Sequence, residues 1–255
     1  MTRLLRFARN DTRFFMSVGI KIENLSKSFG RVLAVDGISM QFAEGRLHGL
    51  IGSDGAGKTT LMRLVLSLLD ADAGSCSFTE EGREVALREI RDAISYMPAR
   101  PSLYPDLSVD EHLSFFKDIY MIGEEEFAEN RERLLSITRL DKFLDRKAGE
   151  LSGGMYKKLG LMCALLQRPK ALLLDEPTNG VDPISRREFW ELLYSLAAEK
   201  ILIVIATAYM DEAERCHEVH LLDRGRMLAT GEPRALLAEA GVRSFDEYYL
   251  KRAES

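Results

Sequence analysis

The amino-acid sequence predicts an α/β fold with a mostly parallel sheet and a helical insert at about residues 100–165. Short apolar runs of strand length alternate with segments in which apolar residues recur at helical spacing. One such run, HGLI, leads into a glycine-rich loop and then into a helix-forming segment. Another, ALLLD, is apolar up to its final aspartate, as expected of a strand buried on both faces.

The N-terminal half is predicted to contain mainly strands. Apolar runs bounded by turn residues predict strands at residues 20–25, 33–43, 45–52, 75–79 and 93–98. A helix is predicted at residues 58–69, where leucine, methionine and valine recur at helical spacing directly after the glycine loop.

The middle of the chain is predicted to be largely helical from Ser108 to about Leu144. Ser108 followed by Glu111 fits a capping box at the start of this region. A further helix is predicted to open at the sequence LSGG and to continue through Leu166.

The C-terminal half returns to alternating strands and helices. Strands are predicted at residues 171–175, 201–207, 218–223 and 226–230. A helix is predicted at residues 183–199, with Pro183 in its first turn, and another at 232–240. We therefore expect a main domain over residues 18–231 and a helical tail over 232–255.

The composition restricts the possible partners. A chain of 255 residues can form one sizeable α/β domain, or a domain with a small insert. A net charge of −5 does not predict nucleic acid as a partner. The three cysteines are far apart and match no disulfide or metal-ligand spacing, so we expect small buried hydrophobes. No segment approaches the ~18 apolar residues that a membrane-spanning helix needs.

Residues 1–17 form a separate leader with two possible interpretations. Arginines alternate with leucine and phenylalanine in MTRLLRFARNDTRFF, which fits a basic amphipathic segment at a membrane surface. The interpretation that we favour is a disordered leader or a wrongly assigned start, because Met16 could begin a complete domain.

The glycine loop GSDGAGKTT matches the phosphate-binding pattern G-x-x-x-x-G-K-[ST]. Its glycines let backbone N–H groups close around a polyphosphate, and the following helix directs its positive end at the same anion. Lys58 adds a mobile positive charge, and the Thr59 hydroxyl can ligate Mg²⁺. A structural glycine turn is the alternative, but the strand before and the helix after favour phosphate binding. The candidate nucleotide-binding residues are Gly52, Ser53, Asp54, Gly55, Ala56, Gly57, Lys58, Thr59 and Thr60.

Two carboxylates end the buried run ALLLD. Asp175 is a hard oxygen ligand at the carboxyl edge of a parallel sheet and suits Mg²⁺, so Thr59 and Asp175 are the candidate metal ligands. Glu176 points elsewhere and is the candidate catalytic base that polarises an attacking water. Alone, such a pair would suggest a solvated loop; beside the phosphate loop it predicts NTP hydrolysis.

The LSGGM motif supplies a second anion-binding device. A serine at the helix cap and two glycines expose the first backbone donors of the next helix. One nucleotide on one chain needs only one phosphate cradle, so we expect this motif to cover the γ-phosphate of a nucleotide bound to a second subunit. Its residues are Leu151, Ser152, Gly153, Gly154 and Met155.

GSDGAGKTT, LSGGM, LLLDEPTNGVDP and TAYMDEAE together resemble the nucleotide-binding domain of ABC transporters, over roughly residues 18–231. The resemblance implies a P-loop NTPase with a RecA-like core, an antiparallel β subdomain and a helical subdomain. It implies ATP and Mg²⁺ as ligands and a head-to-tail dimer, either a homodimer or a heterodimer with another ATP-binding subunit.

The resemblance also implies a place in the cell and a partner. An ATPase of this family acts peripherally at the cytoplasmic face of the membrane, on a separate permease subunit. YMPARPSLYPDLSVDEHL resembles the segment that contacts the membrane partner in multidrug-type exporters, which indicates export. Phe29 lies where the family stacks an aromatic ring on adenine, although a core phenylalanine is the alternative, and Asp182 matches the loop that crosses the dimer interface.

Two residues depart from the family pattern. Ala99 stands where a glutamine usually links Mg²⁺, water and the membrane subunit, and Ala208 stands where a histidine usually touches the γ-phosphate. Neither methyl group forms a hydrogen bond, and loss of such a contact can cost on the order of 10²–10³ in rate. Turnover at this chain's own site is therefore expected to be weak.

The two alanines leave alternatives open beside the exporter ATPase. One is a degenerate nucleotide-binding partner in a heterodimer, or a regulatory nucleotide sensor. Another is a soluble ABC ATPase that acts on ribosomes or DNA, but such proteins usually join two domains or carry basic tails, which this acidic chain does not show.

Overall fold

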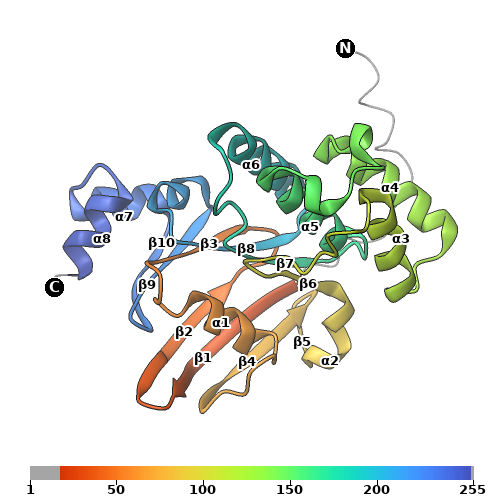
Figure 1. Ribbon diagram of the computed structural model, residues 1–255. Coiled ribbons are helices and arrows are strands. Elements are labelled where there is room, and N and C mark those ends of the chain that lie inside the picture. The colour runs from red at the N-terminus through yellow and green to blue at the C-terminus, as the bar shows by residue number, and fades with distance from the viewer. Residues whose placement is uncertain (1–17, 254–255) are drawn as a thin grey trace.

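The computed structural model describes residues 18–253. Both interpretations of the leader at residues 1–17 concern a segment outside the described residues. The described chain contains an antiparallel sheet, a mostly parallel sheet and helices that cover the parallel sheet (Figure 1).

The antiparallel sheet has four strands in the order β2-β1-β4-β5. Along β1, Ile20 and Ile22 are buried while the residues between and after them are exposed, which is the period of two expected of a half-buried strand. Ile20 pairs with Phe42 of β2 and with Phe78 of β4, so one apolar face runs across the sheet. The strands are β1 (Val18–Phe29), β2 (Val32–Phe42), β4 (Ala73–Glu80) and β5 (Arg83–Val85).

The second sheet has six strands in the order β10-β9-β3-β8-β7-β6. Its pairs are parallel except β9 with β10. Because parallel strands end at one edge, the loops after the neighbours β3, β8 and β7 lie side by side. The strands are β3 (Leu47–Ile51), β6 (Ile94–Met97), β7 (Ala171–Asp175), β8 (Leu202–Thr207), β9 (Glu218–Asp223) and β10 (Arg226–Gly231).

Helix α1 (Lys58–Val65) lies between the two sheets (Figure 1). Its buried side chains Leu61 and Met62 pack in one cluster with the apolar face of the antiparallel sheet and with alternate residues of the parallel strands. The helix was expected to continue to residue 69, but it ends at Val65, because Ser67 takes a left-handed φ of 51°. The glycine loop is thus supported from both sides by apolar packing.

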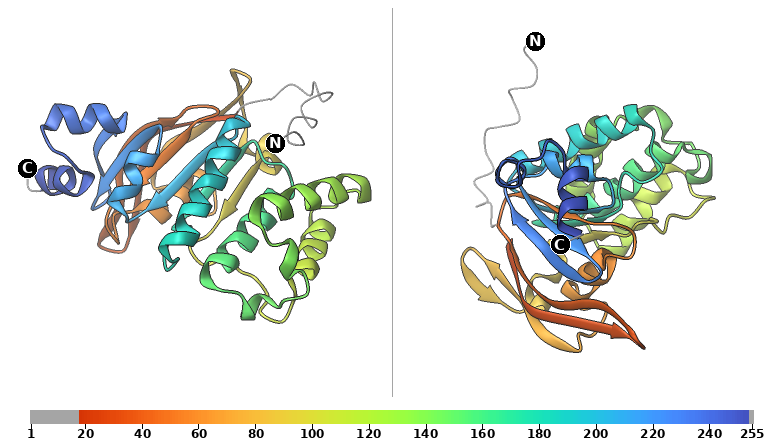
Figure 2. Two further views of the ribbon diagram at one scale, coloured as in Figure 1. Left: turned by 90° about the horizontal axis from the view of Figure 1, so that it is seen from above. Right: turned by 90° about the vertical axis from the view of Figure 1, so that its left-hand side faces the viewer.

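The opposite face of the parallel sheet is covered by α5 (Gly153–Leu165) and α6 (Pro183–Ala198), as Figure 2 shows. Helices α3 (Val109–Ile119) and α4 (Glu124–Thr138) lie beside α5, away from the antiparallel sheet. The capping box at the start of α3 is confirmed, with Ser108 and Glu111 exchanging both hydrogen bonds. The region around 100–165 is therefore largely helical, as expected.

The remaining helices are short. Helix α2 (Leu87–Ile90) follows β5, and both elements were missed at the sequence level. Helices α7 (Pro233–Ala240) and α8 (Phe245–Ala253) form the end of the described chain and lie near β9 and β10 (Figure 1). The 3₁₀ turns are Arg91–Ala93, Asp141–Phe143, Ala148–Glu150 and η4 (Met210–Arg215).

Candidate nucleotide-binding site

The glycine loop connects the end of β3 to the start of α1 in very little space. A Cβ atom on Gly57 would lie 2.3 Å from the carbonyl oxygen of Ala34, and the residue has a φ of 99°. A Cβ on Gly52 would lie 2.4 Å from the carbonyl oxygen of Leu222. Both positions therefore require glycine, so the backbone of residues 52–57 can present its N–H groups without side chains in the way.

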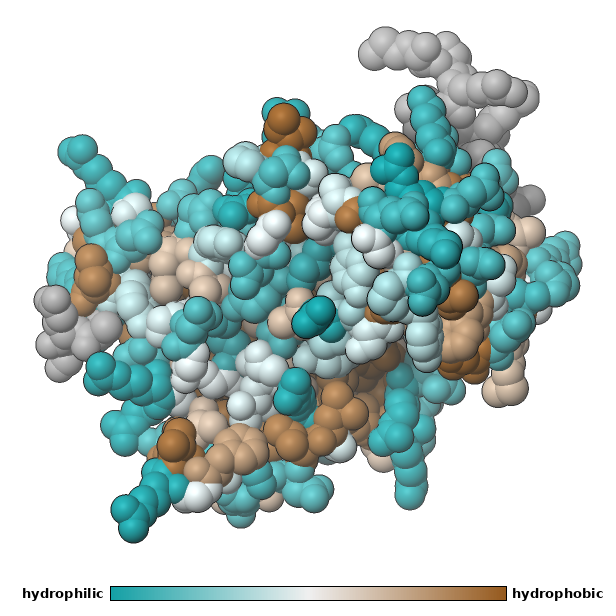
Figure 3. Space-filling view, viewed as in Figure 1, coloured by the Kyte–Doolittle hydropathy of each residue, from teal (hydrophilic) through white to brown (hydrophobic). Residues whose placement is uncertain are grey.

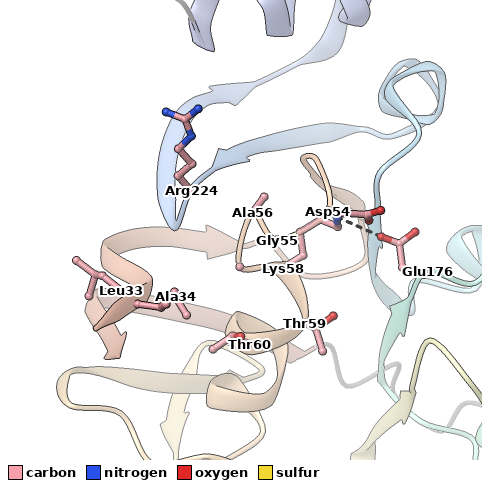
Figure 4. Close-up of a pocket in the computed structure, with 12 residues that line it drawn as sticks. Leu33, Ala34, Asp54, Gly55, Ala56, Lys58, Thr59, Thr60, Glu176 and Arg224 are labelled. Carbon is pink, nitrogen blue, oxygen red and sulfur yellow. Dashed lines mark ion pairs between the residues drawn. The ribbon is translucent and has the colours of Figure 1, made fainter. Parts of the chain in front are cut away.

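Lys58, the first residue of α1, has its ammonium group inside the loop. The side chain is 5% exposed, and Nζ donates hydrogen bonds to the carbonyls of Gly52 at 2.8 Å and Ser53 at 3.1 Å. The same nitrogen lies 3.2 Å from Oε1 of Glu176, the ion pair drawn in Figure 4. A cation is thus fixed where the phosphate-loop pattern requires one.

Asp175 collects two hydroxyl donors at the end of β7. It is 1% exposed, and its two carboxylate oxygens accept from the Thr59 hydroxyl at 3.0 and 2.9 Å. Oδ2 also accepts from the Tyr96 hydroxyl at 3.2 Å. Burial, with the charge of Asp175 as a smaller cause, raises the pKa of Tyr96 to about 12, so this hydroxyl remains a donor at neutral pH. Sequence reasoning missed Tyr96, because only the pairing of β6 with β7 brings it to Asp175.

The donor set of this corner fits Mg²⁺. Magnesium prefers oxygen ligands and usually takes one or two from the protein, completing its shell with water and substrate phosphates. Thr59 and Asp175 supply a hydroxyl and a carboxylate in direct contact, next to the phosphate loop. These two residues would hold the ion.

Glu176 has a strained backbone and a half-buried carboxylate. Its φ of 45° lies in the left-handed region that non-glycine residues rarely adopt. Burial raises the pKa of Glu176, against a lowering by Lys58. Oε2 accepts a long hydrogen bond of 3.4 Å from the backbone N–H of Ala208. A raised pKa makes this carboxylate a stronger base than an ordinary glutamate.

Lys58, Thr59 and Glu176 line one open pocket of about 390 Å³, whereas Asp175 contacts Thr59 but does not line it. Arg224, in the turn between β9 and β10, is one of the lining residues and was not among those identified from sequence; its guanidinium points away from the phosphate loop (Figure 4). Phe29 does not line it: the side chain is 49% exposed on the β1–β2 hairpin, with Lys27 Nζ 5.9 Å from its ring. The lining residues are Val32, Leu33, Ala34, Asp54, Gly55, Ala56, Gly57, Lys58, Thr59, Thr60, Glu176 and Arg224.

The hairpin beside the pocket carries exposed apolar side chains. Figure 3 shows apolar surface gathered over the lower part of this face, where the antiparallel sheet and α1 lie. In that hairpin Phe29, Val32 and Leu33 are exposed. Apolar surface of this kind can take the face of a base, and Leu33 and Ala34 line the pocket whereas Phe29 does not.

The LSGGM motif lies away from this pocket. Ser152 caps α5 by accepting from the N–H of Met155 at 3.3 Å, as expected of an N-cap. A Cβ on Gly154 would lie 2.6 Å from Ser185 Cβ, so this glycine also serves the packing of α5 on α6. Leu151 and Gly153 line a separate groove of about 340 Å³ that also contains Ala99. One chain therefore does not bring the two anion-binding devices together.

Asp182 has a structural role within the chain. Its Oδ1 accepts from the N–H groups of Ile184 at 3.1 Å and Ser185 at 3.0 Å, so it caps α6. Hydrogen bonds from Ser185, first from its side chain and then from its backbone, lower the pKa of Asp182.

Lys157 on α5 connects Ala99, one of the two departures from the family pattern, to Glu176, which follows β7. The residue is 8% exposed, and its ammonium donates to the carbonyl of Ala99 and, at 2.9 Å, to the carbonyl of Glu176. Burial lowers its pKa, against raising contributions from Glu176 and Asp175. A lysine that interrupts an otherwise apolar helix was the sequence signal that could have identified it.

Residues 18–253 show no feature of a membrane-spanning helix or of a clustered metal site. No helix in this range has the length and apolar character needed to cross a bilayer. No group of three or more His, Cys, Asp or Glu side chains in that range is arranged to hold a metal ion.

Comparison with known proteins gives consistent matches. A family model described as "ABC transporter" matches residues 35–179. The probable multidrug ABC transporter ATP-binding protein YbhF of Escherichia coli K12 is 47% identical over 204 residues, which are 79% of this chain and 35% of YbhF. This chain thus spans about a third of that relative. The Nod factor export ATP-binding protein I of Burkholderia thailandensis is 38% identical over 224 residues, 87% of this chain and 74% of that protein.

Solved structures share the fold. An ATP-binding subunit of an ABC transporter superposes with a TM-score of 0.79 at 27% identity and covers 92% of this chain and 99% of its own. The structure of cbiO1 from Clostridium perfringens, part of the ABC transporter complex cbiONQ, has a TM-score of 0.76 at 27% identity, with 87% and 91% covered. The expected P-loop NTPase fold is confirmed. The chain therefore belongs to the ABC transporter family, as one of its ATP-binding subunits.

Proposed function

We propose that this chain binds and hydrolyses ATP to drive export through a separate membrane permease. The observation that carries the proposal is that Lys58, Asp175 and Glu176 lie close together at one edge of the parallel sheet. They adjoin a loop that requires glycine at positions 52 and 57. The direction of transport is supported by YbhF and the Nod factor protein, whose names describe multidrug transport and export.

In this proposal the phosphate loop holds the triphosphate. Backbone N–H groups of the loop, other than those of Gly52 and Ala56 that donate to the carbonyls of Thr207 and Ser53, and the N-terminus of α1 face the polyanion. Phosphate oxygens compete with Glu176 for the Lys58 ammonium, so nucleotide binding weakens that ion pair. Mg²⁺, held by Thr59 and Asp175, would neutralise charge that develops on the transferred phosphoryl group.

Glu176 is proposed to orient the attacking water and accept its proton. Its carboxylate follows directly on Asp175 and is held by Lys58 on one side and by the Ala208 N–H on the other. Loss of the Lys58 ion pair to phosphate removes the main charge that lowers the Glu176 pKa, which makes the carboxylate a stronger base.

Dimerisation is proposed to complete the site. Ser152, Gly153 and Gly154 do not line the pocket of their own chain, which is what a device that caps a partner's nucleotide requires. Asp182 would lie at the same interface, and Phe29 would contact the adenine. A homodimer and a heterodimer both satisfy this arrangement.

The permease contact is proposed for the segment that precedes α3. Residues 98–107 contain Tyr104, which is 52% exposed, and they adjoin the groove that contains Ala99. ATP-driven closure of the dimer would move this segment and the permease helices bound to it, at the cytoplasmic face of the membrane.

A second candidate function follows from the alanines at 99 and 208. Neither side chain can contact a phosphate or water by a hydrogen bond, so this chain's own site would hold ATP but turn it over slowly. In a heterodimer, the site that borrows Ser152 from this chain would then perform most of the hydrolysis.

The test is ATP turnover by the chain copurified with its permease, in variants of the two sites. For the primary proposal, Glu176→Gln abolishes hydrolysis while MgATP binding persists, and permease increases the wild-type rate. For the heterodimer, Ser152→Arg damages turnover more than Glu176→Gln does. Wild-type turnover that neither variant changes contradicts both.

A further inference from the structure

The C-terminal tail packs into the core of the domain. Phe245 is 1% exposed and Tyr248 is fully buried, and both belong to the same apolar cluster as α5, α6 and one face of the parallel sheet. Their helix, α8, packs against η4, which follows the end of β8. The tail is therefore fixed with respect to the edge of the sheet at which the nucleotide site lies.

From this fixed helix, Tyr249 reaches the phosphate loop. Its hydroxyl oxygen lies 3.0 Å from the Ser53 hydroxyl and 2.7 Å from Oδ1 of Asp223, at the end of β9. The phenol has one proton, and the shorter contact is to a carboxylate, so Tyr249 donates to Asp223 and accepts from Ser53. Burial raises the pKa of Tyr249, which keeps the phenol protonated at neutral pH.

Ser53 is well placed to transmit this contact to the loop. Its carbonyl accepts from Lys58 Nζ at 3.1 Å and from the N–H of Ala56, also at 3.1 Å. The Ser53 hydroxyl therefore contacts the tail, while the Ser53 carbonyl contacts Lys58 and the turn of the phosphate loop. The phosphate loop is also attached to the turn that follows Asp223, because Gly225 in this turn donates its N–H to the carbonyl of Ala56 at 3.0 Å.

We propose that Tyr249 is a positioning residue of the phosphate loop, through which the C-terminal tail raises the affinity of this chain for nucleoside triphosphate. The proposal rests on the proposed ATP-binding function. Tyr249 holds the Ser53 hydroxyl and so preorganises residues 53–56 in the conformation that receives phosphate.

The test compares two matched substitutions in the full chain. Tyr249→Phe removes the hydroxyl that contacts Ser53. Tyr248→Phe makes the same change one residue earlier, where the hydroxyl accepts only from Arg252 at 3.3 Å. Since one neutral hydrogen bond is lost, we expect the dissociation constant for MgATP to rise about fivefold in Tyr249→Phe and to stay unchanged in Tyr248→Phe. Calorimetric titration measures both, and thermal melting checks that both variants fold.

A double-mutant cycle locates the effect. If Tyr249 acts through Ser53, Ser53→Ala combined with Tyr249→Phe weakens MgATP binding no more than the stronger single variant does. Effects that multiply, or equal affinities of Tyr249→Phe and Tyr248→Phe, overturn the proposal.

Hydrogen exchange separates this inference from the proposed function. If wild-type protein binds no MgATP, the function fails, and amide exchange in residues 52–57 then decides the positioning role. Faster exchange there in Tyr249→Phe than in Tyr248→Phe supports it, and identical exchange overturns it.

Discussion

Replacing Lys157 with methionine removes the ammonium that joins two backbone segments of the site. In the native protein its Nζ donates to the carbonyls of Ala99 and Glu176. The substitution keeps a long apolar side chain in the buried position, so the packing of α5 changes little. What changes is the hydrogen bond by which α5 holds the backbone of residue 176.

The size of the effect follows from two energies of similar magnitude. A hydrogen bond from a charged donor contributes about 1.5–3 kcal/mol, and without Lys157 the Glu176 carbonyl keeps the N–H of Asn179 at 3.3 Å. Glu176 has a φ of 45°, and such a left-handed conformation costs a non-glycine residue about 1–3 kcal/mol. Since the Lys157 hydrogen bond and the strain nearly balance, we expect residue 176 to relax when that hydrogen bond is removed. A displacement of about 1 Å at a catalytic group can cost on the order of 100-fold in rate, so kcat should fall about 10- to 100-fold.

The assay is steady-state phosphate release by the assembled transporter, with MgATP binding measured separately. Binding should change less than about twofold, because it rests on residues 52–59. Lys157→Arg should recover most of the activity, since a guanidinium can donate to both carbonyls. Lys158→Met is the control: this neighbouring lysine is 7% exposed but pairs with Glu188 at 2.5 Å. A Lys157→Met protein with unchanged kcat would refute the reasoning.

Three further predictions follow. Asp54→Asn removes an exposed negative charge from the pocket, so MgATP should bind about three- to tenfold tighter at low salt, with less gain at high salt. Titration with MgATP at two ionic strengths measures the affinity, and an unchanged affinity would contradict the prediction. Burial lowers the pKa of His48 to about 4 and of His220 to about 3, so unfolded imidazoles with pKa near 6.5 bind protons that the folded ones do not. The free energy of unfolding is therefore retained above pH 6.5 and falls toward pH 4; guanidinium titrations should show this slope flattened in His220→Leu, and an identical slope argues against it. Glu212 is fully buried and accepts from Trp190 Nε1 at 3.1 Å, so Glu212→Ala should lower the free energy of unfolding by about 3 kcal/mol. Denaturant unfolding monitored by tryptophan fluorescence measures this change, and a decrease of less than about 1 kcal/mol would contradict the prediction.

The parts of the site that sequence could predict are those encoded by neighbouring residues. The glycine loop lies between a buried strand and a helix, and the structure has that order, with α1 beginning at Lys58. The capping box of Ser108 and Glu111 is likewise a local signal and is present. Asp175 could be placed at the end of a strand because the four residues before it, ALLL, are all apolar.

The parts that sequence could not predict depend on contacts between distant segments. Tyr96 meets Asp175 across 79 residues, and Tyr249 meets Ser53 across 196. Neither tyrosine belongs to a motif, and each acquires its role only from strand order or from the docking of α8. The short elements β5 and α2 were missed because three or four residues carry too little periodicity.

The position of Phe29 illustrates a different limit. Its place in the sequence fits an adenine contact, but the pocket beside the phosphate loop is lined by Leu33 and Ala34 from the next strand. The contact between Phe29 and nucleotide stays a prediction. Ser152 illustrates the same limit. It does not line the pocket of its own chain, so its predicted role involves a second subunit.

Equilibrium binding of MgATP to the folded chain, beside Lys58→Ala, tests the central claim most directly. If main-chain amides after β3 and the Lys58 ammonium bind the triphosphate, the wild-type protein saturates with one nucleotide per chain and the variant loses most of its affinity. A folded wild-type protein that retains no nucleotide in the presence of Mg²⁺, or a Lys58→Ala protein that binds as tightly as wild type, would contradict the account.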